Sequence, residues 1–235
     1  MNTLSKFLTA AAVAVSTLSM ATVAQAENKP VGITGSLSSV TVMHEGAGVE
    51  LMREQNNANT ITQDFALTSR PCPPFCIQPM VFAPGVDTLG ELEVIDHLVR
   101  MQAGENILVI DSRTPNWVAK GTIPGAVNIS WVGLTPAKGA STEGIMDVML
   151  NQMDVALIGD VDEFEVDEAI VNGNVEDVFD YSNAKTLVLF CNGMWCGQSP
   201  ASMKTLLSFG YPANKIKWFR GGMQTWEVLG LTTVK

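Results

Sequence analysis

The sequence has little of what a metal site or a nucleic-acid surface needs. It contains only 2 histidines and 4 cysteines, and neither close pair of cysteines has the two-residue spacing of zinc-binding or thioredoxin-type motifs. Its 14 Lys and Arg face 24 Asp and Glu, and the resulting net charge of −10 argues against nucleic acids or anionic membranes as partners. We therefore expect no metal, no other cofactor and no nucleic-acid partner.

What is present is ample apolar sequence. The chain has 235 residues, of which 46% are apolar and 16% charged, so it can bury a full core. A globular domain of about 130 residues with an appendage is the natural division. No apolar run after residue 26 approaches the ~20 residues that a bilayer requires.

The first 26 residues have the features of a secretory signal peptide. Lys6 precedes an apolar run over residues 7–24, and Ala24-Gln25-Ala26 is a small-residue cleavage site. A membrane anchor is the alternative, but several Ser and Thr residues dilute the run. We expect cleavage, a periplasmic or otherwise secreted mature protein, and no membrane partner after the signal is removed.

Residues 27–84 form a first segment with short alternating apolar runs. We predict three strands, at residues 40–44, 49–52 and 61–67. The prolines within residues 70–79 then fix φ and remove backbone donors, so this stretch is a rigid connector rather than a helix or central strand. Outside the cytosol its two cysteines, Cys72 and Cys76, are expected to form a structural disulfide; exchange with later cysteines is the alternative.

From residue 85 onward the pattern changes to alternating helices and strands. Thr88 and Glu91 suggest a capping box for a helix whose buried face carries Leu92, Ile95, Leu98 and Val99 and which ends at Gly104. His97 falls off that face and is expected at the surface. Continuous runs of β-branched or aliphatic residues at 107–110 and 186–190 predict buried parallel strands, hence an α/β sheet flanked by helices on both faces.

Residues 143–180 carry 12 of the 24 carboxylates, with no Lys or Arg between residues 139 and 184. Ile145, Met149, Met153 and Leu157 have helical spacing, so we predict an amphipathic helix followed by a solvated acidic loop. Packing explains the methionines better than a copper site, and the carboxylates lack a regular calcium-loop pattern.

The most informative stretch is a cysteine loop between a strand and a helix. Cys191 directly follows the predicted strand 186–190, and a glycine-containing loop then leads to a helix that Ser199 can cap and Pro200 can begin. In an open α/β sheet, ligands bind at this edge.

Such a loop can direct several backbone N–H groups toward the Cys191 sulfur, and the helix N-terminus adds partial positive charge. Both effects favour the thiolate, because helix-terminus sites lower a cysteine pKa from about 8.5 to ~7 or below. The same donors could hold the oxygens of an anion such as thiosulfate. The alternative is that Cys191 is a buried structural residue.

Three blocks between residues 85 and 234 resemble the rhodanese family. They are Leu108-Val-Ile-Asp111-Ser-Arg113 with Gly121-Thr-Ile-Pro-Gly125-Ala-Val-Asn128, then Val188-Leu-Phe-Cys191 with its loop, and finally Phe219-Arg-Gly-Gly-Met223 with Trp226.

The resemblance implies a central parallel sheet and sulfur transfer through a cysteine persulfide. Carried over to this sequence, Cys191 is the sulfur acceptor and Asp111 and Arg113 brace the site. The loop amides then come from Asn192, Gly193, Met194, Trp195, Cys196 and Gly197. Small-molecule sulfur donors and acceptors are the implied partners.

Two departures from the family pattern matter. Thr122 stands where the family often has His, which argues against a base there. Counted back from the helix, the loop is about two residues longer than is usual in the family, as in related phosphatases and arsenate reductases. Residues 192–203, however, contain no Arg or Lys to clamp an oxyanion, which argues against phosphoryl chemistry.

Three roles remain open for Cys196: a resolving thiol, a disulfide partner of Cys191, or a residue that only fills the loop. A sulfurtransferase is therefore our first hypothesis. A thiol-disulfide protein using Cys191 and Cys196, served by a periplasmic reductant or redox protein, is the second, and a non-catalytic binding module is the third.

Four further residues have simpler expected roles. Trp195 is either a lid or a packing residue. Arg220 and Lys204 either attract anions or are solvated, and His44 is expected to be structural.

Overall fold

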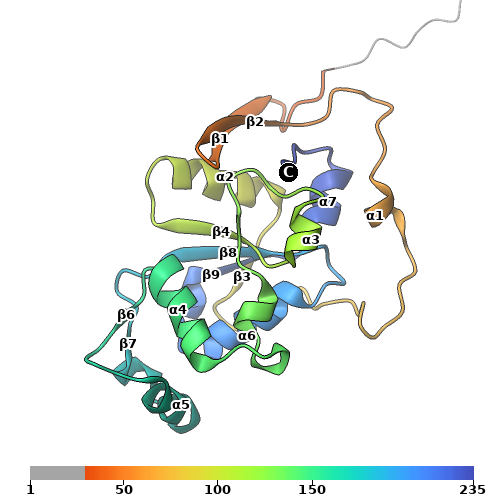
Figure 1. The fold of residues 1–235 in the computed structure, drawn as a ribbon. Coiled ribbons are helices and arrows are strands. Elements are labelled where there is room, and N and C mark those ends of the chain that lie inside the picture. The colour runs from red at the N-terminus through yellow and green to blue at the C-terminus, as the bar shows by residue number, and fades with distance from the viewer. Residues whose placement is uncertain (1–29) are drawn as a thin grey trace, which may run out of the picture.

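The computed structural model describes residues 30–235, so the expected signal peptide at residues 1–26 lies outside the described residues. A five-stranded sheet with strand order β3-β9-β8-β4-β5 forms its centre, and every neighbouring pair is parallel (Figure 1). The strands are β3 (Asp87–Thr88), β4 (Ile107–Asp111), β5 (Val127–Asn128), β8 (Thr186–Phe190) and β9 (Ile216–Phe219).

Alternate residues of β8 pack into two separate cores. Leu187 and Leu189 belong to one apolar cluster with α4 (Thr142–Gln152) and α6 (Gln198–Ser208). Val188 and Phe190 belong to another with α2 (Glu91–Gln102) and α7 (Gly222–Val228). Figure 1 shows these helix pairs on opposite faces of the sheet, which confirms the predicted α/β architecture and explains why residues 187–190 of β8 are all apolar.

The N-terminal segment contains two strands rather than three. The strands predicted at residues 40–44 and 49–52 are present as β1 (Ser39–His44) and β2 (Ala47–Met52), and they pair as an antiparallel hairpin. The prediction of a strand at residues 61–67 is wrong, because this stretch forms a short helix, α1 (Gln63–Ala66). Its one turn buries Phe65 with its ring centroid 6.1 Å from that of Trp117, and the stretch pairs with no strand in the described part of the chain.

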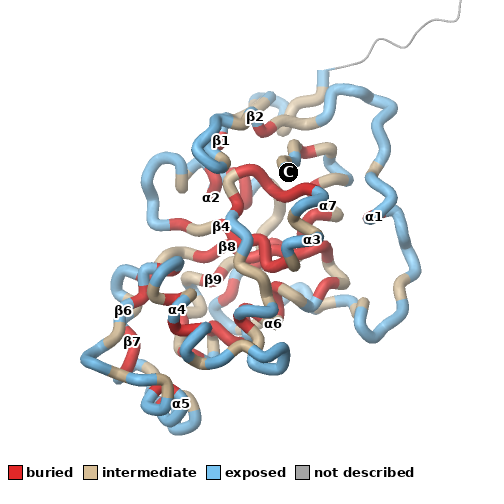
Figure 2. Tube along the Cα trace, viewed as in Figure 1, coloured by how far each residue is buried: buried red, intermediate tan, exposed pale blue. Residues whose placement is uncertain are grey.

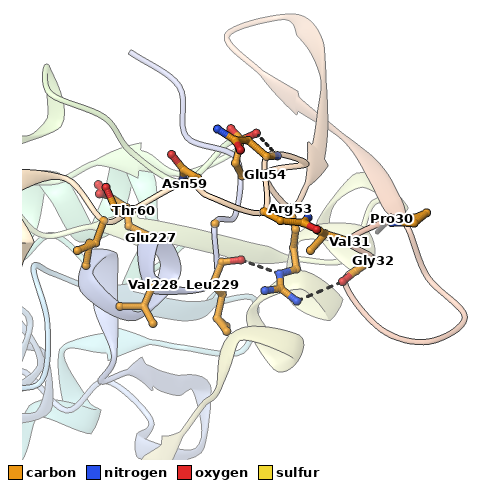
Figure 3. Close-up of a pocket in the computed structure, with 14 residues that line it drawn as sticks. Pro30, Val31, Gly32, Arg53, Glu54, Asn59, Thr60, Glu227, Val228 and Leu229 are labelled. Atoms are coloured by element: carbon orange, nitrogen blue, oxygen red, sulfur yellow. Dashed lines mark hydrogen bonds between the residues drawn. The ribbon is translucent and has the colours of Figure 1, made fainter. Parts of the chain in front are cut away.

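The hairpin packs directly on the sheet domain. Val42 and Leu51 are buried in the same cluster as α2 and α7. A hollow of about 460 Å³ lies where residues 30–32, the chain after β2 and the end of α7 meet (Figure 3). Arg53 donates there to Leu229 O at 2.7 Å, so the hollow joins the N-terminal segment to α7, and none of its lining residues belongs to the cysteine loop.

Helix α2 starts later than predicted, and its buried face is rotated. Thr88 does not cap it, because Thr88 pairs with Trp218 as part of β3; instead Glu93 accepts a hydrogen bond from Gly90 N at 3.0 Å. The buried residues are Val94, Ile95, His97 and Leu98, whereas Leu92 and Val99 are exposed. His97 is therefore not a surface residue; its Nδ1 donates to Glu93 O at 2.7 Å, which satisfies the buried ring.

The acidic region also contains more structure than predicted. α4 ends at Gln152, and Leu157 belongs to the small hairpin of β6 (Ala156–Leu157) and β7 (Phe179–Asp180) instead of the helix. The predicted acidic loop contains a second helix, α5 (Glu163–Asn172), whose Asp162 and Glu165 form a capping box. Burial of Val166 and Ala169 stabilises it, while Ile145, Met149 and Met153 lie in the core as expected.

The remaining elements are short. They are α3 (Pro115–Val118), η1 (Trp131–Leu134), η2 (Pro136–Lys138), η3 (Val175–Asp177) and η4 (Ala213–Lys215). The connector at residues 70–79 contains no helix or strand, as its prolines predict. It lies at the surface, and none of its residues is buried (Figure 2). Within residues 30–235, no helix has the length and apolar character needed to cross a membrane.

Candidate active site around Cys191

Cys191 lies at the carboxyl end of the central strand β8. Phe190 is the last residue of that strand and α6 begins at Gln198, so residues 191–197 form the loop between them. β4 lies beside β8, and its last residue, Asp111, pairs with Phe190. The structure therefore brings Asp111, Arg113 and the loop to one edge of the sheet, where α/β proteins bind ligands.

The Cys191 sulfur is surrounded by hydrogen-bond donors. The hydroxyl of Ser199 donates to Cys191 Sγ at 3.2 Å, and the backbone N–H groups of Gly193 and Ser199 also point at this sulfur. The Cys196 thiol is a further donor to the thiolate. When Cys191 is protonated, its own thiol donates to Cys196 O at 3.5 Å. Ser199 Oγ in turn accepts a hydrogen bond from Trp218 Nε1 at 3.2 Å, which fixes the hydroxyl in place.

These donors reverse the effect of burial on Cys191. Burial raises the pKa of the thiol, but the hydrogen bonds from Cys196, Ser199 and Gly193 stabilise the thiolate more strongly and lower its pKa from 9.0 to about 7. The N-terminus of α6 lies beside the loop and favours negative charge in the same place. Cys191 is therefore substantially ionised at neutral pH.

Cys196 behaves in the opposite way. Burial and the neighbouring Cys191 sulfur raise the pKa of Cys196 well above its usual value, although amides of Gln198 and Asn192 donate to it. Both cysteines are free thiols and both are buried. The pair thus consists of one thiolate and one thiol that donates to it, and the loop amides are divided between the two sulfurs.

Other loop amides remain available to a ligand. Within the described part of the chain, no protein acceptor receives a hydrogen bond from the N–H groups of Met194, Trp195 and Gly197. The Cys196 N–H, in contrast, donates to Gly193 O at 2.8 Å and closes the loop on itself. Amides that are free in this way can hold the oxygens of an anion.

Helix α7 holds the opposite side of the loop. Met223 N donates to Cys191 O and Gln224 N to Asn192 O, both at 2.9 Å, so these two carbonyls are held by the helix N-terminus. Gly222 permits this approach: its φ is +55°, and a Cβ there would collide with Cys191 O and Gly193 N. Gly222 is thus explained by contact with the cysteine loop, whereas a Cβ at Gly221 would collide with the Thr225 side chain of α7.

Asp111 and Arg113 form a buried ion pair beneath the loop. Arg113 Nη2 lies 2.6 Å from Asp111 Oδ2, and each side chain is 1% exposed. Thr122 Oγ1 donates to the same carboxylate at 2.7 Å, and Arg113 Nη1 approaches Asn192 Oδ1 at 3.5 Å. These residues therefore support the loop and do not face its sulfur.

The connector packs against the cysteine loop from outside. Its Cys72–Cys76 disulfide is present, as expected. Gln78 N donates to Met194 O at 2.8 Å, and the Phe75 ring stands edge-on to Trp195 with centroids 5.5 Å apart. Trp195 Nε1 donates to Gln224 Oε1 at 2.8 Å, so Trp195 is fixed between the connector and α7.

The two cations considered as anion ligands lie elsewhere. Arg220 donates to the carbonyl oxygens of Gln78 and Pro79, which anchors the connector, and Lys204 is exposed on α6. His44 is structural, since its Nδ1 accepts a hydrogen bond from Gly125 N at 3.2 Å.

A cavity of about 500 Å³ lies against the loop. Asn192, Trp195, Cys196, Gly197 and Gln198 form one side of it, and residues of the connector and of η1 and η2 form the other. Cys191 does not line it and is 2% exposed, whereas Cys196, whose thiol interacts with the Cys191 sulfur, does line it. Nowhere in residues 30–235 do three or more His, Cys, Asp or Glu residues gather into a possible metal site.

Two features of the site were not visible in the sequence. Ser199 does not cap α6, because the cap position is Gly197; the Ser199 hydroxyl donates to the Cys191 sulfur instead. Pro200 is not the first helical residue either, since α6 begins at Gln198. Arg70 and Phe75 reach the cavity from the connector. The position of Ser199 in the first turn after the loop is the only signal that hinted at its contact.

Residues 94–228 match the family model described as the rhodanese-like domain, which is more than half of the chain. The chain belongs to the rhodanese-like domain family. The matched region begins within α2 and includes Asp111, Arg113, the cysteine loop and Gly222. The hairpin β1-β2 and the connector lie outside it.

Among solved structures, the human single-domain sulfurtransferase TSTD1 is similar to this rhodanese-like protein. The identity is 16% and the TM-score 0.32, and the match covers 62% of this chain and 96% of that chain. No curated protein matches the sequence.

Proposed function

We propose that this rhodanese-like protein is an exported sulfurtransferase that carries sulfane sulfur on Cys191. The observation that supports this most strongly is the set of donors around one sulfur: Ser199, Gly193 and Cys196 lower the pKa of Cys191 to about 7. A thiolate is the nucleophile that sulfur transfer requires.

In the proposed reaction, the Cys191 thiolate attacks the outer sulfur of a donor such as thiosulfate. A bond forms between Cys191 Sγ and that sulfur, the donor's sulfur–sulfur bond breaks, and sulfite leaves with the electron pair. The persulfide anion on Cys191 then replaces the thiolate among the same N–H and O–H donors. A thiophilic acceptor attacks the outer sulfur and restores the Cys191 thiolate.

Mass spectrometry of the reduced protein after incubation with thiosulfate tests this proposal. We expect the peptide containing Cys191 to gain the mass of one sulfur atom, and cyanide to remove it as thiocyanate. The Cys191→Ser variant is the matched control and should gain nothing. Failure of thiosulfate and of other sulfane donors to modify Cys191 would contradict the proposal.

A second candidate is a thiol-disulfide redox function. It is favoured by the direct hydrogen bond between the Cys196 thiol and Cys191, because two adjacent free thiols are placed for oxidation to a disulfide. In that reaction both thiols lose a proton and together give two electrons to a disulfide substrate, which is reduced to two thiols.

The Cys196→Ser variant separates the two candidates. Serine keeps a hydroxyl that can donate to Cys191, so a sulfurtransferase should retain persulfide formation in this variant. A dithiol redox protein should lose turnover completely, because its second electron-carrying thiol is gone. The measurement is thiocyanate production beside reduction of a disulfide substrate, with the parent protein assayed in parallel.

The export proposal is supported by the Cys72–Cys76 disulfide, because such bonds persist mainly in oxidising compartments. Cell fractionation and N-terminal sequencing of the mature protein test it. A new N-terminus after Ala26 in the periplasmic or secreted fraction is expected, whereas an intact N-terminus in the cytosol would contradict it.

A further inference from the structure

Both cysteines of the loop, Cys191 and Cys196, have hydrogen-bond donors of their own. Two backbone N–H groups and the Ser199 hydroxyl point at Cys191 Sγ. The N–H groups of Asn192 and Gln198 donate to Cys196 Sγ. Sulfur transfer through Cys191 alone requires only the first set of donors, so the second set has no role in the reaction described above.

The two cysteines differ in their access to the cavity beside the loop. Both side chains are nearly fully buried, with Cys191 2% and Cys196 5% exposed. Cys196 nevertheless lines the cavity of about 500 Å³, whereas Cys191 does not. An organic acceptor that occupies this cavity therefore meets the sulfur of Cys196 and not that of Cys191.

The two sulfur atoms are in direct contact. The Cys196 thiol donates a hydrogen bond to the Cys191 thiolate, and both cysteines are free thiols. A persulfide on Cys191 places its outer sulfur about 2 Å from Cys191 Sγ, which is the length of a sulfur–sulfur bond. The outer sulfur therefore stays within reach of the Cys196 thiol.

The proton affinities of the two sulfurs favour transfer in one direction. The donors around Cys191 lower its pKa to about 7, so Cys191 leaves readily as a thiolate when a sulfur–sulfur bond breaks. Burial and the neighbouring Cys191 sulfur raise the pKa of Cys196 well above its usual value. Once its proton has moved, Cys196 is the stronger nucleophile of the pair, because nucleophilicity of a thiolate rises with its pKa.

We propose that Cys196 is a second sulfur carrier, which takes the outer sulfur from the Cys191 persulfide and presents it to acceptors in the cavity. The proposal rests on the sulfurtransferase function above. The Cys196 proton first moves to the outer sulfur of the persulfide anion. Cys196 Sγ then bonds to that sulfur, its bond to Cys191 Sγ breaks, and Cys191 leaves with the electron pair as a thiolate. An acceptor thiol finally takes the outer sulfur from Cys196 and leaves its proton there, so no oxidant or reductant is consumed.

Isotope labelling can locate the transferred sulfur. The protein is loaded with thiosulfate that carries a heavy isotope in its outer sulfur, alkylated and digested with trypsin. Fragmentation of the peptide spanning residues 186–204, which contains both cysteines, then assigns the label to Cys191 or Cys196. We expect label on both cysteines of the parent, on Cys191 alone in Cys196→Ser, and on neither loop cysteine in Cys191→Ser.

Single-turnover transfer to two acceptors of different size measures the role of Cys196. Cyanide is small enough to take sulfur from Cys191 directly, whereas glutathione meets Cys196 in the cavity. The glutathione rate relative to the cyanide rate should fall about tenfold or more in Cys196→Ser, because the second carrier is lost. Cys196→Ala is the matched variant: it also lacks the sulfur, but only serine keeps a donor to Cys191. A relay predicts the same loss in both variants.

The possible failures of the relay and of the sulfurtransferase function are distinguishable. Absence of label from Cys196 in the parent, or a loss of glutathione transfer in Cys196→Ala but not in Cys196→Ser, would overturn the relay and leave Cys191 as the only carrier. Label on Cys196 in the Cys191→Ser protein would also overturn it, since Cys196 would then take sulfur from the donor itself. No label on either cysteine with any sulfane donor would overturn the sulfurtransferase function.

Discussion

At the scale of single residues, the chemistry depends on how one buried sulfur is stabilised as an anion. Burial alone would keep Cys191 protonated, and the fold overcomes this with two side-chain donors and two backbone amides. Ser199 has a special position among them, because its hydroxyl links Cys191 to the buried Trp218. The Ser199 hydroxyl thus couples the thiolate to the packing of β9.

The pH dependence of alkylation tests this arrangement. Only the thiolate reacts, so the iodoacetamide rate of Cys191 should fall as pH decreases through a midpoint near 7. Ser199→Ala should raise that midpoint by about one unit or more, because one hydrogen bond to the charged form is lost. Peptide mass spectrometry distinguishes Cys191 from Cys196.

Ser202→Ala is the control for this substitution. Its hydroxyl lies in the same helix but donates to Gln198 O, at 3.4 Å, rather than to the sulfur. The Ser202→Ala midpoint should match the parent. A parent midpoint near 9, or equal shifts in the two variants, would show that Ser199 does not stabilise the thiolate.

At the scale of elements, two segments hold the cysteine loop from opposite sides. Helix α7 holds the carbonyls of Cys191 and Asn192, and the connector bonds to Met194 and packs on Trp195. The first contact lies within the shared domain and shapes the loop, whereas the second comes from the N-terminal segment and covers it.

Gly222→Ala should disrupt the α7 contact. The added Cβ would collide with Cys191 O and Gly193 N, and the positive φ disfavours alanine as well. We expect a loss of about 2 kcal/mol or more in the free energy of unfolding, together with a rise in the Cys191 pKa. Urea unfolding and the alkylation profile measure the two effects.

Gly133→Ala provides the comparison, since a Cβ at Gly133 meets no atom within 4 Å and its φ is not positive. Its stability should remain close to that of the parent. If Gly222→Ala behaved like Gly133→Ala, the close approach of α7 to the loop would not be required.

The disulfide should control how firmly the connector covers the loop. Replacing Cys72 and Cys76 together with Ser removes a constraint worth at most about 2 kcal/mol for so short a loop. We expect Cys196, which lines the cavity, to react faster with a thiol probe at fixed pH, while global stability changes little. Unchanged reactivity would mean that the connector stays in place without its disulfide.

At the scale of the whole molecule, the N-terminal hairpin shares a core with the sheet domain. Leu51 and Val42 lie in the same apolar cluster as Val94, Leu98 and Trp226. The hairpin and the sheet domain are therefore expected to unfold together, because removing the hairpin would expose the apolar face of α2 and α7.

Leu51→Ala tests that coupling. Truncating a fully buried leucine costs about 2–5 kcal/mol, which should lower the Tm of the whole protein by roughly 4–20 °C in a single transition. Val171→Ala, on the 84% exposed side chain of α5, should leave the Tm nearly unchanged. Two separate transitions, with only the lower one shifted by Leu51→Ala, would show that the hairpin folds independently.

Local patterns in the sequence were sufficient for the parts of this fold that depend on neighbouring residues. The run at residues 186–190 has no polar residue after Thr186, because both faces of β8 are covered, and its predicted bounds match the observed ones. The Cys72–Cys76 disulfide joins residues only four apart, so composition and spacing were enough. The position of Cys191 between a strand and a helix follows from the same kind of pattern.

Only the tertiary structure decided the features that join distant parts of the chain. His97 is buried because α2 is rotated against the sheet and the hairpin, and residues 61–67 form a helical turn because Phe65 packs on Trp117. Ser199 reaches Cys191, and Arg70 reaches the loop cavity, through packing that no periodicity encodes. Hydrophobic patterning specifies which faces are buried, but the partner across each face is determined by the packing of the complete chain.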